Sequence, residues 1–129
     1  MYTGIKQKSS LALPDRVFKI AVQLDWETAC RTGLYSGSKV DLRDGFIHLS
    51  GPTQVNGTLA KHFKSQRDLL LIAFETAALA EDLKWEVSRG GDVFPHFYAP
   101  LMTAKALWTR PLVLGLADVP VCDEAWLKC

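Results

Sequence analysis

The longest apolar run in the chain, residues 69–74 (LLLIAF), is the feature that most restricts how the chain folds. Its six residues are far too few to cross a bilayer as a helix, which takes about 20. A short run without polar alternation is typical of a central β-strand that is buried on both faces. The sequence therefore predicts a sheet with residues 68–74 at its centre.

Two main helices are expected in the first half of the chain. The first covers residues 26–32, with Asp25 as its N-cap and Gly33 as its stop. The second is capped by Thr53 and carries one apolar stripe at positions i, i+4 and i+8. The stripe consists of Val55, Leu59 and Phe63. Residues 33–44, between the helices, are expected to be a Gly- and Ser-rich loop.

The rest of the pattern predicts short strands without a regular alternation of strand and helix. The predicted strands are residues 17–21, 46–49, 85–87, 96–98 and 104–114, the last interrupted by Pro111. Residues 76–82 are expected to form a short helix or helical turn. Strands with two helices inserted near the N-terminus predict an α+β domain.

The length of 129 residues fits one domain. We expect a flexible leader over residues 1–13, broken by Pro14, then a single domain over residues 14–116 and a C-terminal tail over residues 117–129. The first ten residues carry lysines but no apolar core before a cleavage site, so no signal peptide is predicted.

Charge and cysteine content exclude several classes of function. Fifteen basic and fourteen acidic residues give a net charge of +1, which points to neither duplex nucleic acid nor a membrane surface as a partner. Cys30, Cys122 and Cys129 are widely spaced and odd in number, which favours a reducing cytoplasm over a disulfide framework. Cys30 falls within the first predicted helix and is expected to be a small core residue. The oligomeric state stays open.

The segment DGFIHLS places polar side chains in a predicted strand. Side chains alternate across a strand, so Ile47 and Leu49 share the face toward the core. Phe46, His48 and Ser50 then share the other face. An imidazole and a hydroxyl beside an aromatic ring are a common pocket lining. The alternative is that His48 is half buried and bonded to a neighbouring carbonyl.

A second polar strand follows in the segment KWEVS. Alternation turns Trp85 and Val87 inward and Glu86 to the opposite face. There Glu86 is suited to act as a general base or to accept hydrogen bonds from ligand hydroxyls such as those of ribose. An ordinary surface carboxylate with a partner fits the pattern equally well.

Arg89 precedes the pair Gly90-Gly91, and this turn is a candidate anion site. The glycines permit positive φ and let backbone amides converge. A guanidinium beside such a turn can hold a phosphate or a carboxylate through two hydrogen bonds. The alternative is a plain turn with a solvated arginine.

The segment FPHFY surrounds His96 with aromatic residues and one proline. Pro95 fixes the local backbone, so the imidazole of His96 is expected to be held in one orientation. Tyr98 adds a hydroxyl two residues later. The alternative is a packed histidine bonded to the main chain.

Taken together, these motifs resemble the bacterial domain-of-unknown-function 952 family. The segments that carry the resemblance are Val17–Ile20, Trp26, Asp44–Ser50, Trp85–Glu86, Ser88–Gly91 and Phe94–Tyr98. It covers roughly residues 17–114, in order and at suitable spacing. The resemblance implies a fold related to the ADP-ribosyltransferases, a split pair of small mixed or antiparallel sheets around a nicotinamide-binding cleft. It implies no established activity.

A shorter segment, His48-Leu49-Ser50, is similar to the His-Leu-Ser strand of the NAD-using RNA 2′-phosphotransferases. Those enzymes carry a histidine in the first core strand that grips the nicotinamide ribose. This chain has Phe18-Lys19-Ile20 there, which argues against NAD as a cofactor, and the cofactor stays open. The resemblance implies that Glu86 takes the place of the transferase glutamate.

Two hypotheses of function follow. In the first, the cleft performs transferase-like chemistry on a nucleotide or another phosphorylated ligand: Arg89 holds the anion, His48 orients a hydroxyl and Glu86 polarises the nucleophile. In the second, the cleft binds a small anionic metabolite or a protein without catalysis. A purely structural role for these residues is the third alternative. The predicted site residues are Glu86 and His48 as catalytic groups, and His48, Ser50, Arg89, Gly90, Gly91, His96 and Tyr98 as ligand-binding groups, with no metal ligand.

Overall fold

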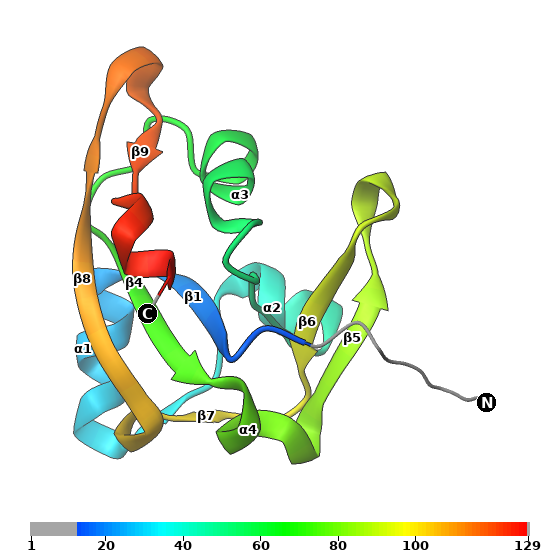
Figure 1. Cartoon of the computed structure of the whole chain (residues 1–129). Coiled ribbons are helices and arrows are strands. Elements are labelled where there is room, and N and C mark those ends of the chain that lie inside the picture. The colour runs from blue at the N-terminus through cyan, green and yellow to red at the C-terminus, as the bar shows by residue number, and fades with distance from the viewer. Residues whose placement is uncertain (1–12, 129) are drawn as a thin grey trace.

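Residues 13–128 are described by the computed structural model, and a four-stranded antiparallel sheet forms their centre (Figure 1). Its strand order is β1-β4-β8-β9. The strands are β1 (Arg16–Val22), β4 (Leu69–Glu75), β8 (Ala106–Leu114) and β9 (Pro120–Val121). The predicted leader lies outside the described residues except for Leu13.

The apolar run is strand β4, and its position confirms the prediction of a central strand. It pairs with β1 on one side and β8 on the other, and residues 69–74 are all buried. Both sheet faces are covered, so every position of the run is buried and no polar alternation is needed.

A second antiparallel sheet has the order β3-β6-β5 and stands opposite the first (Figure 1). Its strands are β3 (Ile47–His48), β5 (Leu83–Val87) and β6 (Val93–Phe97). A separate pair joins β2 (Leu34–Tyr35) to β7 (Leu101–Met102). These curled antiparallel sheets with helices packed on them confirm the α+β class.

One backbone bridge links the two sheets. The Phe18 N–H donates to the Ser50 carbonyl at 2.8 Å, and the Ser50 N–H donates to the Phe18 carbonyl at 2.9 Å. The residues that follow β3 therefore lie directly beside β1. This contact places the polar face of the second sheet next to the middle of the first.

The described residues contain four α-helices: α1 (Gln23–Thr32), α2 (Lys39–Asp44), α3 (Val55–His62) and α4 (Thr76–Leu79). No helix among residues 13–128 is long and apolar enough to span a membrane. Gly33 ends α1 with φ 88°, as predicted, because glycine adopts the left-handed conformation without a Cβ clash.

The predicted helix starts were wrong. Helix α1 begins at Gln23 with Val22 as its N-cap, and Asp25 lies in the first turn, where its charge still complements the helix dipole. The N-cap of α3 is Gln54 and not Thr53. In both helices the side chain at the cap position makes no capping hydrogen bond.

The predicted loop over residues 33–44 was also wrong, since it contains β2 and α2. Helix α2 begins with a capping box: the Ser38 hydroxyl accepts from the Asp41 N–H, and the Asp41 carboxylate accepts from the Ser38 N–H. These reciprocal bonds satisfy two backbone donors and stabilise a helix of only six residues.

Two side chains and one strand also differ from expectation. Cys30 is exposed, because helix α1 presents Trp26 and Ala29 to the core. Val87 is 71% exposed, since the β5–β6 hairpin extends beyond the core at that point. Strand β8 continues through Pro111, where β4 lies on one side and β9 pairs only with residues 113 and 114. Proline is tolerated in a strand where no partner needs its N–H.

The hydrophobic core fills both faces of the first sheet. Helix α1 covers one face, where Trp26 packs against Phe74 with 6.2 Å between ring centroids. Helix α3 covers the other face through Val55 and Leu59, which are fully buried. Burial of a leucine side chain of this kind contributes about 1.5–3 kcal/mol to stability.

The predicted C-terminal tail packs on the α3 side of the core. Cys122 and Leu127 are buried there, and the rings of Trp126 and Trp108 lie 6.4 Å apart. Burial raises the pKa of the Cys122 thiol to about 11. Residues 117–128 therefore belong to the domain, while Cys129 lies outside the described residues.

Candidate functional site

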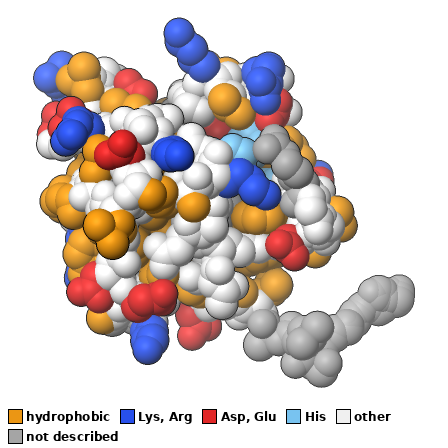
Figure 2. Space-filling view, turned by 90° about the horizontal axis from the view of Figure 1, so that it is seen from above, with side chains coloured by type: hydrophobic (Ala, Val, Ile, Leu, Met, Phe, Trp, Pro, Cys, Tyr) orange, Lys and Arg blue, Asp and Glu red, His pale blue; other side chains and the backbone are white. Residues whose placement is uncertain are grey.

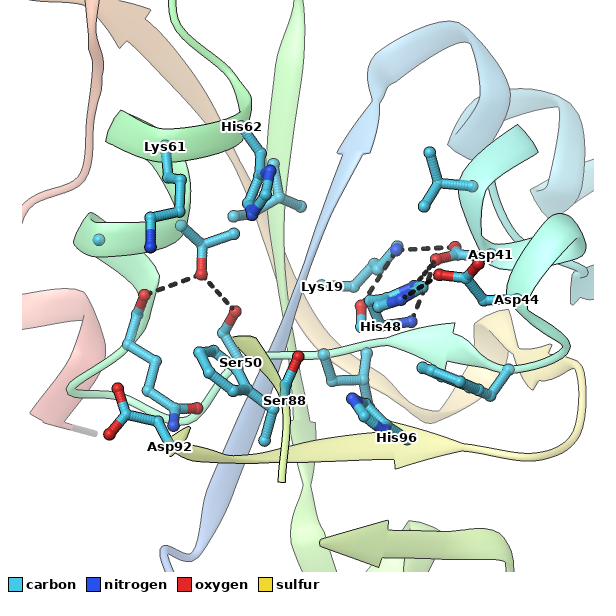
Figure 3. A pocket seen from close by; sticks show the side chains of 18 of the residues that line it. Lys19, Asp41, Asp44, His48, Ser50, Lys61, His62, Ser88, Asp92 and His96 are labelled. Atoms are coloured by element: carbon cyan, nitrogen blue, oxygen red, sulfur yellow. Dashed lines mark hydrogen bonds and ion pairs between the residues drawn. The ribbon is translucent and has the colours of Figure 1, made fainter. Parts of the chain in front are cut away.

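A cavity of about 840 Å³ opens between helix α3, strand β3 and the β5–β6 hairpin (Figure 3). Charged and polar side chains stand at both of its ends. Figure 3 shows Lys19, Asp41, Asp44 and His48 at one end and Ser50, Lys61 and Asp92 at the other, with His96 of β6 close to His48. We call these the Asp41 end and the Lys61 end.

The alternation predicted for β3 is confirmed. Ile47 and Leu49 are 3% and 2% exposed and belong to the core, while Phe46, His48 and Ser50 line the cavity. The ladder between β3 and β6 pairs His48 with His96, which brings two imidazoles to the same face with ring centroids 5.6 Å apart.

The Asp41 carboxylate organises one end of the cavity. It is 2% exposed and accepts from the Lys19 ammonium at 2.8 Å and from the backbone N–H of Ser38 at 2.9 Å. Its other oxygen accepts from Nδ1 of His48 at 2.7 Å and from the His48 backbone N–H at 3.1 Å. The carboxylate is therefore fully satisfied.

Burial and pairing act in opposite directions on this cluster. Burial by itself raises the pKa of Asp41, but the hydrogen bond from His48 and the charge of Lys19 outweigh it and hold that pKa well below its ordinary range. Burial lowers the pKa of Lys19, and Asp41 partly offsets this effect. A second bond, from the Lys19 ammonium to the His48 carbonyl at 3.0 Å, ties strand β1 to β3.

Both ring nitrogens of His48 face carboxylates. Nε2 lies 3.0 Å from Asp44, whose own pKa is lowered by the hydrogen bond from Arg43 and by their charge attraction, with a smaller part from His48. With Nδ1 against Asp41, His48 has no ring nitrogen left for a ligand in this arrangement. The His48 side chain is 36% exposed, and its ring still forms part of the cavity wall.

His96 is held differently, by Glu86 and with one nitrogen unused. An ionised carboxylate only accepts, so Nδ1–H of His96 donates to Oε1 of Glu86 at 2.8 Å. The Tyr98 hydroxyl donates to the same oxygen at 2.6 Å. Nε2 of His96 has no hydrogen-bond partner among residues 13–128, although the residue is only 5% exposed and lines the cavity.

The ring of Phe46 helps to fix the orientation of His96. It stacks on the imidazole with 4.0 Å between centroids and an interplanar angle of 25°.

The hydrogen bonds also shift the pKa values of the partners of His96. The bonds from Tyr98 and His96 lower the pKa of Glu86, and the bond to Glu86 raises the pKa of Tyr98. The carboxylate is thus kept ionised, which favours the Nδ1–H tautomer of a neutral His96.

The glycine turn at the hairpin tip forms another part of the wall. Gly90 and Gly91 have φ of 83° and 85°, which are the positive φ values that the glycine pair permits. The Gly91 N–H donates to the Ser88 carbonyl at 3.1 Å, so this amide is used within the turn. Gly90 and Ser88 line the cavity, whereas the predicted Arg89 side chain lies outside the described part of the structure.

One face of helix α3 borders the Lys61 end. Gln54, Thr58 and Lys61 lie three to four residues apart and therefore on one side of the helix. The Gln54 side-chain amide donates to the Val93 carbonyl at 2.7 Å and fastens the hairpin to the start of α3. At Gly57, on the same face, an added Cβ would meet open space.

The structure groups the predicted residues around His96 more than around His48. His48, Ser50, Gly90 and His96 line the cavity, whereas Glu86 and Tyr98 are joined to it through His96. Charged wall residues that we did not predict include Lys19, Asp41, Asp44 and Lys61. The Ser-x-x-Asp spacing at residues 38–41 is a capping signature that would have located Asp41.

The donors present here do not form a metal centre. Within residues 13–128, no three His, Cys, Asp or Glu side chains are placed to hold a metal ion together. The fold and the wall define an α+β domain with a polar cavity that carries two histidines from adjacent strands.

The chain belongs to a family described as "Protein of unknown function (DUF952)", whose profile matches residues 20–109. This confirms the family resemblance drawn from the motifs. Among the curated proteins, no relative matches.

Solved structures of one protein are similar to the chain. The crystal structure of protein CC0527 from Caulobacter crescentus is 45% identical, with a TM-score of 0.80, over 82% of this chain and 93% of that chain. A crystal structure of its double mutant is 43% identical, with a TM-score of 0.79 over the same shares. Its solution NMR structure is 45% identical, with a TM-score of 0.75, over 82% of this chain and 91% of that chain.

Proposed function

We propose that the protein binds a small anionic ligand of nucleotide size in the cavity, with His96 as the acid–base group that meets it. The observation that carries this proposal is Nε2 of His96, which no group in residues 13–128 uses, on a nearly buried ring oriented by Glu86 and Phe46. Buried polar atoms are normally satisfied, so an oriented nitrogen without a partner at a cavity wall favours a ligand contact.

The size and charge of the cavity support the proposal. Its volume of about 840 Å³ lies in the range of ligand pockets, roughly 300–1,000 Å³. Seen from above, histidine surface lies in a hollow with lysine and arginine side chains around it (Figure 2). Lys61 lines the cavity and has no ion-pair partner among residues 13–128, so its ammonium is available to an anion.

The geometry gives Glu86 and His96 different roles. A neutral His96 with Nδ1–H bound to Glu86 presents a lone pair at Nε2, which can take a proton from a ligand hydroxyl. Glu86 is then a positioning residue, because it fixes the tautomer and stabilises the imidazolium that forms. His48, whose nitrogens both face carboxylates, contributes to the wall and not to proton transfer.

A second candidate function is transferase chemistry on an ADP-ribosyltransferase-like fold. It is favoured by the two curled sheets, joined at Phe18 and Ser50, that stand on either side of the cavity. It requires Glu86 to leave His96 and Tyr98 and to face the ligand directly. Release of nicotinamide from NAD that disappears in Glu86→Ala would support it, and an absence of release at millimolar NAD would remove it.

The exposed thiol of Cys30 supports a reducing, cytoplasmic location, because an oxidising compartment would expose it to disulfide exchange. A small metabolite is the proposed partner; neither duplex nucleic acid nor a membrane is.

The proposed binding is tested by thermal unfolding with nucleotides, sugar phosphates and organic acids. A ligand at 100 times its dissociation constant should stabilise the protein by about 2.7 kcal/mol. The stabilisation should be lost in His96→Gln and weakened in Lys61→Ala. Lys64→Ala, which removes an exposed lysine outside the cavity, is the matched control and should bind normally. Equal stabilisation of wild type and His96→Gln, or none with any anion, would overturn the proposal.

A further inference from the structure

We infer that the ligand is a phosphorylated polyol, such as a sugar phosphate, whose hydroxyls meet His96 and Ser50 while its phosphate meets Lys61. The inference rests on the proposed function and specifies the class of ligand. Among the described residues, the cavity wall leaves particular hydrogen-bond donors and acceptors unused, and these define the groups that the ligand must carry.

His96 offers an acceptor. Its Nδ1–H is committed to Glu86, so a neutral ring presents only the lone pair of Nε2. A ligand atom that satisfies this lone pair must carry a hydrogen. A hydroxyl does so, whereas a phosphate or carboxylate oxygen that is fully ionised does not.

Ser50 offers a second acceptor. The Thr58 hydroxyl donates its single hydrogen to the Gln54 carbonyl at 3.0 Å. In the 3.3 Å contact between Ser50 Oγ and Thr58 Oγ1, Ser50 must therefore be the donor. The hydrogen of Ser50 points to Thr58, and its oxygen keeps lone pairs for the cavity, although the residue is only 4% exposed.

The two acceptors lie on one wall. His48 pairs with His96 across the ladder, and Ser50 follows two residues later on the same face of the chain. Diagonal neighbours of this kind have their Cβ atoms about 7–8 Å apart, and both side chains reach toward the cavity. Two hydroxyls on neighbouring or alternate carbons of a polyol can donate to His96 and Ser50 at the same time. A ligand with a single hydroxyl can satisfy only one of these acceptors.

The Lys61 end supplies the opposite chemistry. The Lys61 ammonium carries three donors and no acceptor, so it requires an anionic or acceptor group on the ligand. Gly57, one turn earlier on α3, has no side chain and leaves room beside the helix backbone for a bulky phosphate. Asp92 is also on the wall and has no ion pair within the described part of the chain, so it repels a second anionic group and accepts a further hydroxyl.

The test compares ribose 5-phosphate with pyrophosphate and methyl phosphate by isothermal titration calorimetry. These last two probes carry the anion without a polyol. Ribose 5-phosphate should bind at least about tenfold more tightly than pyrophosphate or methyl phosphate. One further satisfied hydrogen bond changes the dissociation constant by about this factor. Gluconate, a polyol with a carboxylate, distinguishes phosphate from other anions and should bind more weakly than ribose 5-phosphate.

Matched variants locate the contacts. Ser50→Ala should weaken ribose 5-phosphate about tenfold and leave pyrophosphate unchanged, because only the polyol uses Ser50. Lys61→Ala should weaken both probes, and Lys64→Ala neither. Circular dichroism confirms that each variant is folded.

The outcomes separate this inference from the proposed function. If pyrophosphate binds as tightly as ribose 5-phosphate, the polyol inference fails while the anion-binding proposal stands. If Ser50→Ala weakens both probes equally, the assignment of a hydroxyl to Ser50 is wrong. If no anion binds to the wild-type protein, the proposed function fails as well.

Discussion

Two of the histidines that line the cavity, His48 and His96, are paired strand neighbours, yet their surroundings differ in kind. His48 lies between two carboxylates, one of them the buried Asp41 that also binds Lys19. His96 is bonded through one nitrogen to the partly exposed Glu86, and its other nitrogen has no partner among the residues that the structure describes. One cluster is closed and fully satisfied, whereas the other has one position unfilled.

This difference separates what stabilises the fold from what meets a ligand. The Asp41 cluster joins β1, α2 and β3 through buried charged hydrogen bonds, so loss of one member leaves the others unsatisfied. The Glu86 carboxylate is partly exposed, so water can reach it when a partner is lost. We therefore expect changes at the first cluster to affect stability and changes at the second to affect binding.

The largest expected effect follows replacement of Asp41 by alanine. It leaves the Lys19 ammonium buried without a counter-charge, which should lower the free energy of unfolding by about 3–5 kcal/mol. Urea unfolding monitored by tryptophan fluorescence measures this loss. Glu86→Ala is the matched control and should lose much less, because the Glu86 side chain is 39% exposed.

A double variant sharpens the same comparison. Asp41→Asn together with Lys19→Met removes both charges, and it should be more stable than Asp41→Ala because no unpaired charge remains in the interior. Equal losses in Asp41→Ala and Glu86→Ala would contradict the distinction between the two clusters.

Acid should destabilise the protein through the Asp41 cluster. The pKa of Asp41 is lower in the folded protein than its ordinary value of 3.8, so its stabilisation is fully present above that value. The stabilisation is lost as the pH falls through the folded-state pKa, and urea midpoints should decline below about pH 4. Asp41→Asn should show a flatter decline over the same range. A decline of the same steepness in both proteins would assign acid sensitivity to other carboxylates.

Substitution of each histidine in turn should separate residues that stabilise the fold from residues that bind the ligand. His48→Ala removes a donor from a buried carboxylate and should lower the free energy of unfolding by about 1–3 kcal/mol, with ligand stabilisation retained. His96→Gln should retain most of the stability and lose the ligand effect. Thermal unfolding with and without ribose 5-phosphate measures both quantities, and the reverse pattern would exchange the two roles.

The smallest expected effect is a gain in the free energy of unfolding. Gly57→Ala adds a methyl group in open space within a helix, where alanine is preferred, so stability should rise by about 0.5–1 kcal/mol. Gly33→Ala is the control: its Cβ also meets nothing, but the residue has φ +88°, so stability should fall. A loss in Gly57→Ala would show that this position is not open.

The sequence predicted the strands better than the charged cluster. Residues 69–74 and the alternation of Ile47 and His48 were readable because they depend on local burial alone. The start of α1 was misplaced, since no side chain marks its N-cap. Cys30 was misjudged because a general preference of free cysteines for the core does not say which face of the helix is buried. Val87 follows the alternation rule but lies where the hairpin has left the core.

The Asp41 cluster could not be derived from local pattern. Helix α2 has six residues, too few for an apolar period, and only its capping box marks it. In the sequence, Lys19 is a charged residue within an apolar strand, and its partner Asp41 is 22 positions away. Only the tertiary structure shows that the two side chains form an ion pair. Similarly, the two nitrogens of His48 are used up by partners that the strand motif does not reveal.

Long-range ¹H–¹⁵N NMR spectra of the imidazoles, recorded with and without ribose 5-phosphate, test the central claim most directly. We predict that the free protein shows His96 with its proton on Nδ1, and that saturation with ligand shifts the Nε2 resonance of His96 while both nitrogens of His48 stay in place. Movement of His48 with an unchanged His96, or no movement of either at millimolar ligand, would contradict the account.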